Sequence, residues 1–162
     1  MKNLSYLSKI VLVAIVAFYI NACDKDEFDV KYDIAGDWKV ISFEDYENST
    51  VVTKTEDNTW SQFNNGDNTV SFIPSNETSG IVSGQNVTNT FSTNYTIDKK
   101  GGISFSGGIW TMINEPEWGK LFHSISEAET YEIKNGHLII LKRIRKKALL
   151  LKKWMNNTKA NR

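Results

Sequence analysis

Apolar and polar side chains alternate with a period of two in many short stretches between residues 34 and 154, most clearly over Phe91–Ile97. Glycine pairs at 101–102 and 107–108 and the dipeptide Asn135-Gly136 separate several of these stretches. Such alternation is typical of half-buried β-strands, and Asn-Gly between two of them is a strong hairpin signal. The pattern therefore predicts a mainly β fold, an antiparallel meander or partly open barrel.

The expected strands are short and are bounded by glycine, asparagine or proline. They lie at residues 34–43, 51–52, 69–73, 81–82, 91–97, 103–105, 109–113, 130–133, 137–141 and 148–154. The glycine pairs at 101–102 and 107–108 are both interpreted as hairpin turns. A helix over residues 138–154 is the alternative for the last two strands, but its apolar residues form continuous runs and no helical stripe.

The period changes once, between residues 116 and 127. Apolar residues there recur at i, i+3, i+4 and i+7, as expected for one face of an amphipathic helix: Trp118, Leu121, Phe122 and Ile125. Asn114 is the expected N-cap, with Pro116 in the first turn. Because an isolated helix would leave this stripe exposed, we expect the sheet to curl around it.

An unbroken apolar run of eleven residues, Ile10–Ile20, follows a start that carries Lys2 and Lys9 and no acidic residue. As a helix this run would span ~16 Å, which is too short for the ~30 Å hydrocarbon core of a membrane. The run is typical of the core of a signal peptide, and it ends at Ala22-Cys23. Residues 1–22 are therefore predicted to be a signal peptide.

The sequence Ile20-Asn21-Ala22-Cys23 resembles the lipobox of bacterial lipoproteins, although Asn21 is not the favoured residue at its position. The resemblance implies cleavage between Ala22 and Cys23, attachment of diacylglycerol to the Cys23 sulfur, and often acylation of the new amine by a fatty acid such as palmitate. The membrane partner would then be held through these acyl chains. The alternative is an ordinary secretory signal with an incidental cysteine.

Acidic residues are dense over residues 24–29, directly after the cysteine. This cluster resembles the surface-export signal of Bacteroidetes lipoproteins, and it implies an outer-membrane location, on the periplasmic face or at the cell surface. A solvated tether is the alternative. The predicted organisation is a signal peptide (1–22), a lipidated acidic tether (23–33), a β domain (34–154) and a polar tail (155–162).

The formal net charge of zero hides an uneven distribution. Residues 23–141 hold 19 acidic and 8 basic side chains, whereas residues 142–162 hold nine basic and no acidic ones. Because the chain has no basic excess, a nucleic-acid partner is not expected. The basic cluster could instead contact anionic lipid headgroups, or it could be a solvated hairpin. The candidate membrane-surface residues are Arg143, Arg145, Lys146 and Lys147.

Few residues suit catalysis or metal binding. The chain has one cysteine and two histidines, His123 and His137, and neither histidine has a second ligand at helical or strand spacing. No nucleophile motif or phosphate-binding glycine loop occurs. We therefore expect no enzyme, no cofactor and no metal. Trp60, in a polar loop, is the candidate for exposure and for stacking against a glycan.

The mature chain resembles the META domain, a family of secreted bacterial lipoproteins, over residues 34–153. Short motifs carry this resemblance: Gly36-Asp37-Trp38, then Gly84, Asn89, Phe91 and Tyr95, then Thr111-Met112, and finally Tyr131, Ile133, Leu138 and Ile140. The two positions where family members often have cysteines hold Thr88 and Asn114, so the family disulfide is absent. The resemblance implies an antiparallel sheet curled around one helix and a cell-envelope role without catalytic residues.

A lipocalin-like lipoprotein domain is the second resemblance, because Gly-x-Trp on the first strand also opens that family. It implies a barrel that carries an apolar ligand in its lumen. The sequence thus leaves three function classes open. They are an accessory envelope lipoprotein acting by protein or envelope contact, a carrier of an apolar ligand, and a surface glycan-binding protein. Its protein partner or ligand is not specified by the sequence.

Overall fold

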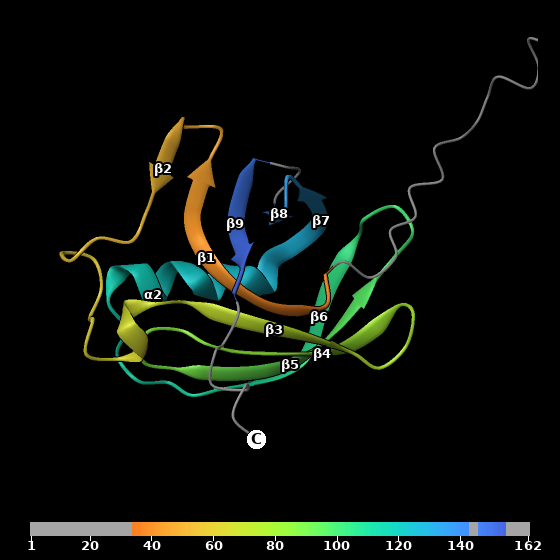
Figure 1. Ribbon diagram of the computed structural model, residues 1–162, viewed down its shortest axis with the longest axis horizontal. Helices are drawn as coiled ribbons and strands as arrows, with labels where there is room; N and C mark the ends of the chain where they lie inside the picture. Colours follow the sequence, from red (N-terminus) through yellow and green to blue (C-terminus); the bar gives the residue numbers. More distant parts are fainter. Residues whose placement is uncertain (1–33, 143–145, 155–162) are drawn as a thin grey trace, which may run out of the picture.

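A computed structural model of the chain describes residues 34–142 and 146–154, and over these residues one antiparallel sheet dominates the fold (Figure 1). Its strands are β1 (Gly36–Asp45), β2 (Thr50–Val52), β3 (Thr69–Pro74), β4 (Ser79–Gln85), β5 (Thr90–Ile97), β6 (Ile103–Trp110), β7 (Ala128–Lys134), β8 (His137–Lys142) and β9 (Lys147–Lys153). The helical elements are α2 (Glu117–Phe122) and two 3₁₀ turns, η1 (Asn64–Gly66) and η2 (His123–Glu127).

The sheet consists of two meanders joined by β1. Its strand order is β6-β5-β4-β3-β1-β9-β8-β7, and β2 pairs with the far half of β1. The first and last strands of this order, β6 and β7, approach each other at one point. There Gly102 and Thr130 form a β-bridge, and the Tyr131 N–H donates to the Gly101 carbonyl at 2.8 Å. The sheet is therefore a curled half-barrel, which confirms the prediction of a mainly β fold around one helix.

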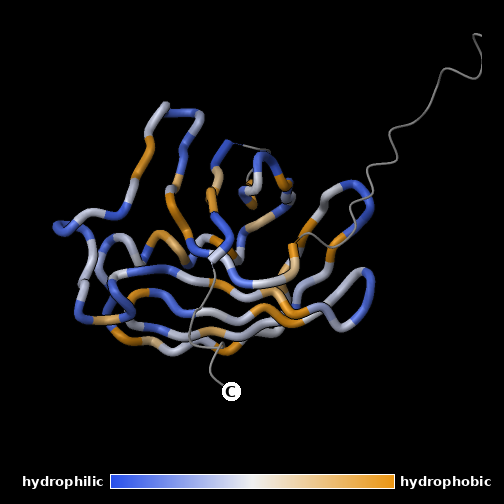
Figure 2. The backbone as a smooth tube through the Cα atoms, viewed as in Figure 1, coloured by the Kyte–Doolittle hydropathy of each residue, from blue (hydrophilic) through white to orange (hydrophobic). Residues whose placement is uncertain are grey.

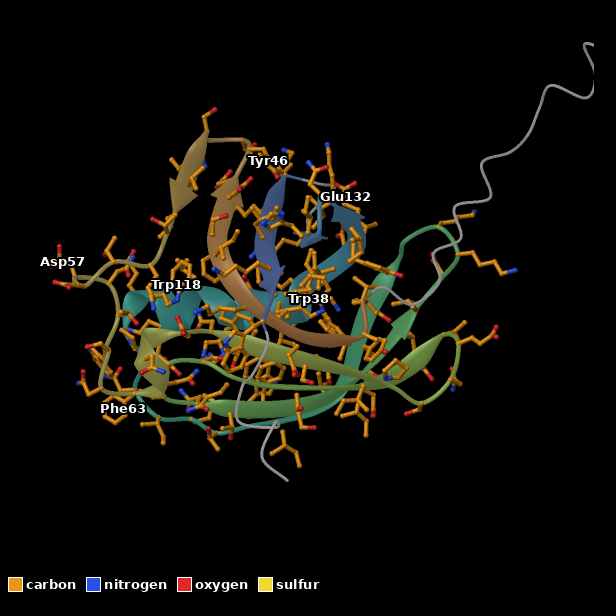
Figure 3. The ribbon with its side chains drawn as sticks, viewed as in Figure 1. Trp38, Tyr46, Asp57, Phe63, Trp118 and Glu132 are labelled. Atoms are coloured by element: carbon orange, nitrogen blue, oxygen red, sulfur yellow. The ribbon has the colours of Figure 1, made fainter. Side chains whose placement is uncertain are left out.

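The helix lies on the concave side of the sheet, between the β3–β5 part and the β7–β9 part (Figure 1). Trp118, Phe122 and Ile125 are buried there, and Leu121 is half-buried, so the predicted stripe does face the core. The rings of Trp118 and Phe43 meet edge to face at 4.8 Å. Figure 3 shows Trp118 and Trp38 inside the curl of the sheet.

Alternation places one side of each strand in this core. In β5, Phe91, Thr93, Tyr95 and Ile97 are buried and the residues between them are exposed. In Figure 2 hydrophobic and hydrophilic segments alternate along β3 to β5, while the loop between β2 and β3 is largely hydrophilic. The polar side of these strands therefore forms the outer face of the sheet.

Two glycines of β4 make room for aromatic rings of β5. Gly80 pairs with Tyr95 and Gly84 with Phe91 across the two strands. A Cβ atom added to Gly80 would lie 2.7 Å from Cε1 of Tyr95, and one on Gly84 would lie 2.5 Å from Cε1 of Phe91. Each ring therefore covers the backbone of its cross-strand glycine, where any side chain would collide with it.

A buried carboxylate joins the β4–β5 turn to the start of α2. Glu115 is 3% exposed, and its Oε1 accepts hydrogen bonds from the Thr88 N–H at 3.0 Å, the Asn89 N–H at 2.8 Å and the Asn89 side-chain amide at 2.8 Å. Two further buried amides donate to backbone carbonyls of the helix, Asn68 to Trp118 at 2.9 Å and Asn86 to Gly119 at 3.3 Å. These bonds fix the helix on the sheet.

Three local predictions were wrong. Gly107 and Gly108 form a bulge inside the continuous strand β6, because the register shifts opposite Thr93 and Gly107 has φ of +63°, so the expected turn there is absent. Pro116, with φ of −65° and ψ of 170°, occupies the N-cap position expected for Asn114. The α-helix ends at Phe122, and residues 123–127 continue it as a 3₁₀ turn.

Candidate binding site on the outer face of the sheet

Small polar side chains form rows across the outer face. One row crosses five strands, because consecutive backbone pairings align Asp37, Ser71, Ser83, Ser92 and Ile109. A neighbouring row aligns Lys39, Thr69, Gln85 and Thr90. Lys39 is ion-paired with Asp67 at 3.0 Å. The outer face is therefore rich in hydroxyl and amide groups, and Asp37 is the carboxylate in these two rows.

A hollow of ≈490 Å³ lies where these rows meet the end of β9. We call it the outer hollow; it is lined by Asp37, Asn64, Thr69, Val70, Ser71, Ser83, Gly84, Gln85, Thr90, Phe91 and Trp154. Val70 and Phe91 turn their side chains into the core, so they line the hollow with backbone. Trp154 is held beside β1 because its N–H donates to the Asp37 carbonyl at 2.9 Å.

Polar groups of the outer hollow are available to a ligand. Within the described residues, no hydrogen bond is made by the side chains of Asp37, Ser71, Ser83, Gln85 and Thr90. Trp154 is half-buried, which leaves part of its indole accessible. Sequence reasoning missed this site, because only the register of β1, β3, β4 and β9 places these residues side by side.

An exposed apolar strip, which we call the apolar rim, lies at the β6 end of the sheet. It consists of Ile109, Met112 and Ile113, whose exposed fractions are 79%, 87% and 63%. β6 is the end of the strand order, and beyond the bridge at Gly102 no described strand pairs with its outer edge. Exposed apolar residues beside an open strand edge are typical of a surface that binds another protein.

Two lysines of the basic cluster are ion-paired with acidic residues at the end of β1 and in the β1–β2 turn. Lys146 Nζ lies 3.1 Å from Glu47 Oε1, and Lys147 Nζ lies 3.1 Å from Asp45 Oδ2. The β1–β2 turn and the start of β9 lie at the same end of the sheet (Figure 1), where Figure 3 also shows Tyr46 and Glu132. Arg143 and Arg145 lie outside the described residues. The membrane contact that the sequence suggests for this cluster stays a prediction.

Asp45 is the most strongly shifted carboxyl at this end. The Asn48 side chain donates to it at 3.0 Å, and with the Asn48 N–H and Lys147 it lowers the pKa of Asp45 to about 2. A carboxyl whose pKa is lower in the folded than in the unfolded chain stabilises the fold above its unfolded pKa. This contribution is therefore lost as the pH falls from about 4 toward about 2.

We therefore expect Asp45→Asn to reduce the acid sensitivity of the protein. The asparagine retains an oxygen for the turn but cannot be protonated, so the drop in urea midpoint between pH 5 and pH 2 should be smaller than in the wild type. Denaturation followed by tryptophan fluorescence at both pH values measures it. Glu56→Gln, an exposed carboxyl in the next loop, is the control. Equal drops in wild type and Asp45→Asn would refute the assignment.

Trp60 is less exposed than expected. It is half-buried and packs against the core, and its ring lies 6.3 Å from that of Phe63. Phe63 is 47% exposed and lies with Asp57 at one end of the molecule, on the loop between β2 and β3 (Figure 3). The proposed role of Trp60 in glycan stacking remains a prediction. Ala22 and Cys23, the predicted cleavage and lipidation sites, lie outside the described residues.

The concave side of the sheet is largely filled by α2. A smaller cavity of ≈160 Å³ remains between β6 and η2, lined in part by Phe91, Trp110 and Ile125.

Among the described residues, no cluster of three or more His, Cys, Asp or Glu side chains could hold a metal ion. The rings of His123 and Trp110 lie 5.1 Å apart, tilted by 35°, and the His137 Nδ1 lies 3.1 Å from the Asn135 carbonyl oxygen. None of the helices in the described residues has the length and apolarity to span a membrane.

Comparison with known proteins corrects the family suggested by the sequence. A family model described as phage tail ring protein 3/4 (CrAss ring) matches residues 21–157. Among solved structures, the chain is similar to a DUF4847 family protein from Bacteroides vulgatus ATCC 8482, with a TM-score of 0.50 and 12% identity over 73% of this chain and 92% of that one. This similarity concerns the fold alone. No curated protein matches the chain.

The META and lipocalin resemblances were therefore wrong. Their motifs are short, and the structure gives each a role that other curled sheets also need. Gly84 makes room for Phe91, Asn89 binds Glu115, and Trp38 fills the core. Such motifs meet packing requirements of the fold, so they do not distinguish between families that share the fold. Because the family model covers most of its length, the chain belongs to the phage tail ring protein 3/4 family.

Proposed function

We propose that this protein is a lipid-anchored, non-catalytic lipoprotein of the bacterial outer membrane that acts by contact with other proteins. The observation that carries the proposal is the order of segments at its start: two lysines, the apolar run Ile10–Ile20, and Ala22-Cys23. The family match begins at residue 21, close to the end of the predicted signal peptide. Two or three acyl chains on Cys23 anchor a protein stably, whereas one chain is marginal.

The apolar rim supports the second half of the proposal. Ile109, Met112 and Ile113 are largely exposed beside an open edge of the sheet, where another polypeptide can cover them. The family is named for rings of a phage tail, and a ring is built by contacts between protein subunits. Both observations favour a role in protein contact.

A second candidate function is self-assembly into a ring, which the family membership favours. In that case the partner at the apolar rim is another copy of this chain. The two candidates differ in the identity of this partner, so one cross-linking experiment separates them.

The anchor is tested by growing cells with an alkyne-labelled palmitate and isolating the protein. We expect the wild type to carry the label and to sediment with membranes until detergent is added, because its acyl chains insert into the bilayer. Cys23→Ser should carry no label. Lys25→Ser, which retains the cysteine, is the matched control and should behave like the wild type. Unlabelled wild type, or a labelled Cys23→Ser, would refute the anchor.

The contact is tested in the same cells with a photo-reactive amino acid at position 109 and, as the control, at position 132. Glu132 is exposed on β7, away from the apolar rim. A discrete cross-linked product that forms only from position 109 supports contact through the rim. A product of twice the subunit mass identifies a second copy and supports the ring. The same products from both positions, or none, would count against a contact at the rim.

A further inference from the structure

We infer that the outer hollow is a binding site for a neutral oligosaccharide, with Trp154 as the stacking surface and Asp37 as a hydrogen-bond acceptor. The inference concerns the folded domain alone. It is independent of the proposed anchor and of the apolar rim, because the residues that line the hollow and those of the rim are different. Failure of either proposal therefore leaves the other unchanged.

The hydrogen-bonding groups of the hollow suit a ligand that is rich in hydroxyl groups. Ser71, Ser83 and Thr90 each offer a hydroxyl that can donate and accept, Gln85 offers both an amide donor and an amide acceptor, and Asp37 offers a carboxylate. These groups make no hydrogen bond within the described residues, so a ligand does not have to displace an internal partner. A ligand covered with hydroxyl groups matches this set, because each hydroxyl also both donates and accepts.

An aromatic side chain at the edge of the hollow, Trp154, suits the flat face of a sugar ring. Trp154 is half-buried and lies next to Asp37, to whose carbonyl its backbone N–H is bonded at 2.9 Å. One face of a pyranose ring carries mainly C–H groups, which pack against the flat indole while the ring hydroxyls reach polar neighbours. An indole is suited to such a ligand because it offers a large rigid surface.

The charge of the lining residues and the volume of the hollow also favour a neutral oligosaccharide. No lysine or arginine lines the hollow, so its lining offers no cationic side chain to bind an anionic sugar or a phosphate. Half-buried Trp154 is the one aromatic side chain that the hollow offers to a ligand, and this surface is too small for an apolar ligand. A volume of ≈490 Å³ falls in the range of ~300–1,000 Å³ that is typical of small-molecule sites. A neutral oligosaccharide meets all three conditions.

The test is isothermal titration of the purified full chain with maltohexaose, mannohexaose and chitohexaose, and with hexagalacturonate as the anionic comparison. We expect at least one neutral probe to bind at millimolar concentration and hexagalacturonate to bind more weakly. Trp154→Ala should weaken the binding of that probe about tenfold or more. Tyr46→Ala removes an aromatic side chain that is 51% exposed at the β1–β2 turn, outside the lining of the hollow, and should leave binding unchanged.

A second variant tests the same site in case Trp154→Ala does not fold. Ser83→Phe places a bulky ring in the hollow from an outer-face strand position, so it should abolish binding while the urea midpoint stays close to that of the wild type. The inference is overturned if no neutral probe binds at millimolar concentration. It is equally overturned if binding survives both Trp154→Ala and Ser83→Phe, or if hexagalacturonate binds more tightly than every neutral probe.

Discussion

Replacing Glu115 by alanine should lower the free energy of unfolding by about 2–3 kcal/mol, because buried hydrogen-bond donors lose their acceptor. The substitution removes the buried carboxylate that accepts three hydrogen bonds from Thr88 and Asn89. The Asn89 N–H is buried, and Glu115 is its acceptor among the described residues. Without Glu115 this N–H would remain unsatisfied, at a cost of about 1–3 kcal/mol. The link between the β4–β5 turn and the helix would be lost with it.

Urea denaturation followed by tryptophan fluorescence measures this change. Glu117→Ala is the matched control, because Glu117 is exposed in the first turn of the same helix and should change stability by less than about 0.5 kcal/mol. Glu115→Gln keeps one acceptor oxygen and loses the charge, so its effect should be intermediate. If Glu115→Ala were as stable as Glu117→Ala, the carboxylate would not be what fixes the helix.

The second large effect is expected at Gly80. An added Cβ would collide with the backbone carbonyl of Ile73 and would lie 2.7 Å from Cε1 of Tyr95, which is almost fully buried. Because the interior is closely packed, the ring cannot move aside without displacing its neighbours. Gly80→Ala should therefore destabilise the protein by about 2–3 kcal/mol through overpacking.

A double-mutant cycle with Tyr95→Leu separates the clash with the ring from other costs of the new methyl group. In the Tyr95→Leu background the ring is absent, so Gly80→Ala should cost clearly less than in the wild type. Ser83→Ala, three residues along β4 on the outer face, is the control and should be nearly neutral. Additive effects of Gly80→Ala and Tyr95→Leu would show that the ring does not cause the strain.

The secondary structure was largely predictable because each strand and the helix carry a local period. The alternation in β5 and the stripe of Trp118, Phe122 and Ile125 both identify buried faces that the structure confirms. The bulge at Gly107 and Gly108 was not predictable, because a glycine pair indicates a turn and a bulge equally well until the partner strand is known.

The candidate site was much less predictable than the fold. Trp154 and Asp37 lie more than a hundred residues apart in sequence, and only the pairing of β1 with β9 brings them together. Ser71, Ser83 and Thr90 carry no distinguishing motif. Exposure also depends on tertiary packing, which explains why Trp60, expected to be exposed, packs partly against the core. Family assignment from motifs failed for a related reason, because motifs that similar folds share do not distinguish one family from another.

The position of β1 has a consequence for when the chain can fold. This strand belongs to the start of the domain, yet one of its two long neighbours is β9, the last strand of the sheet. Contacts of such wide sequence separation form slowly, and β1 cannot complete them before residue 153 is available. A chain exported as proposed has to stay unfolded during its passage. In such an export, the pairing of β1 with β9 would delay completion of the sheet until residue 153 had crossed the membrane.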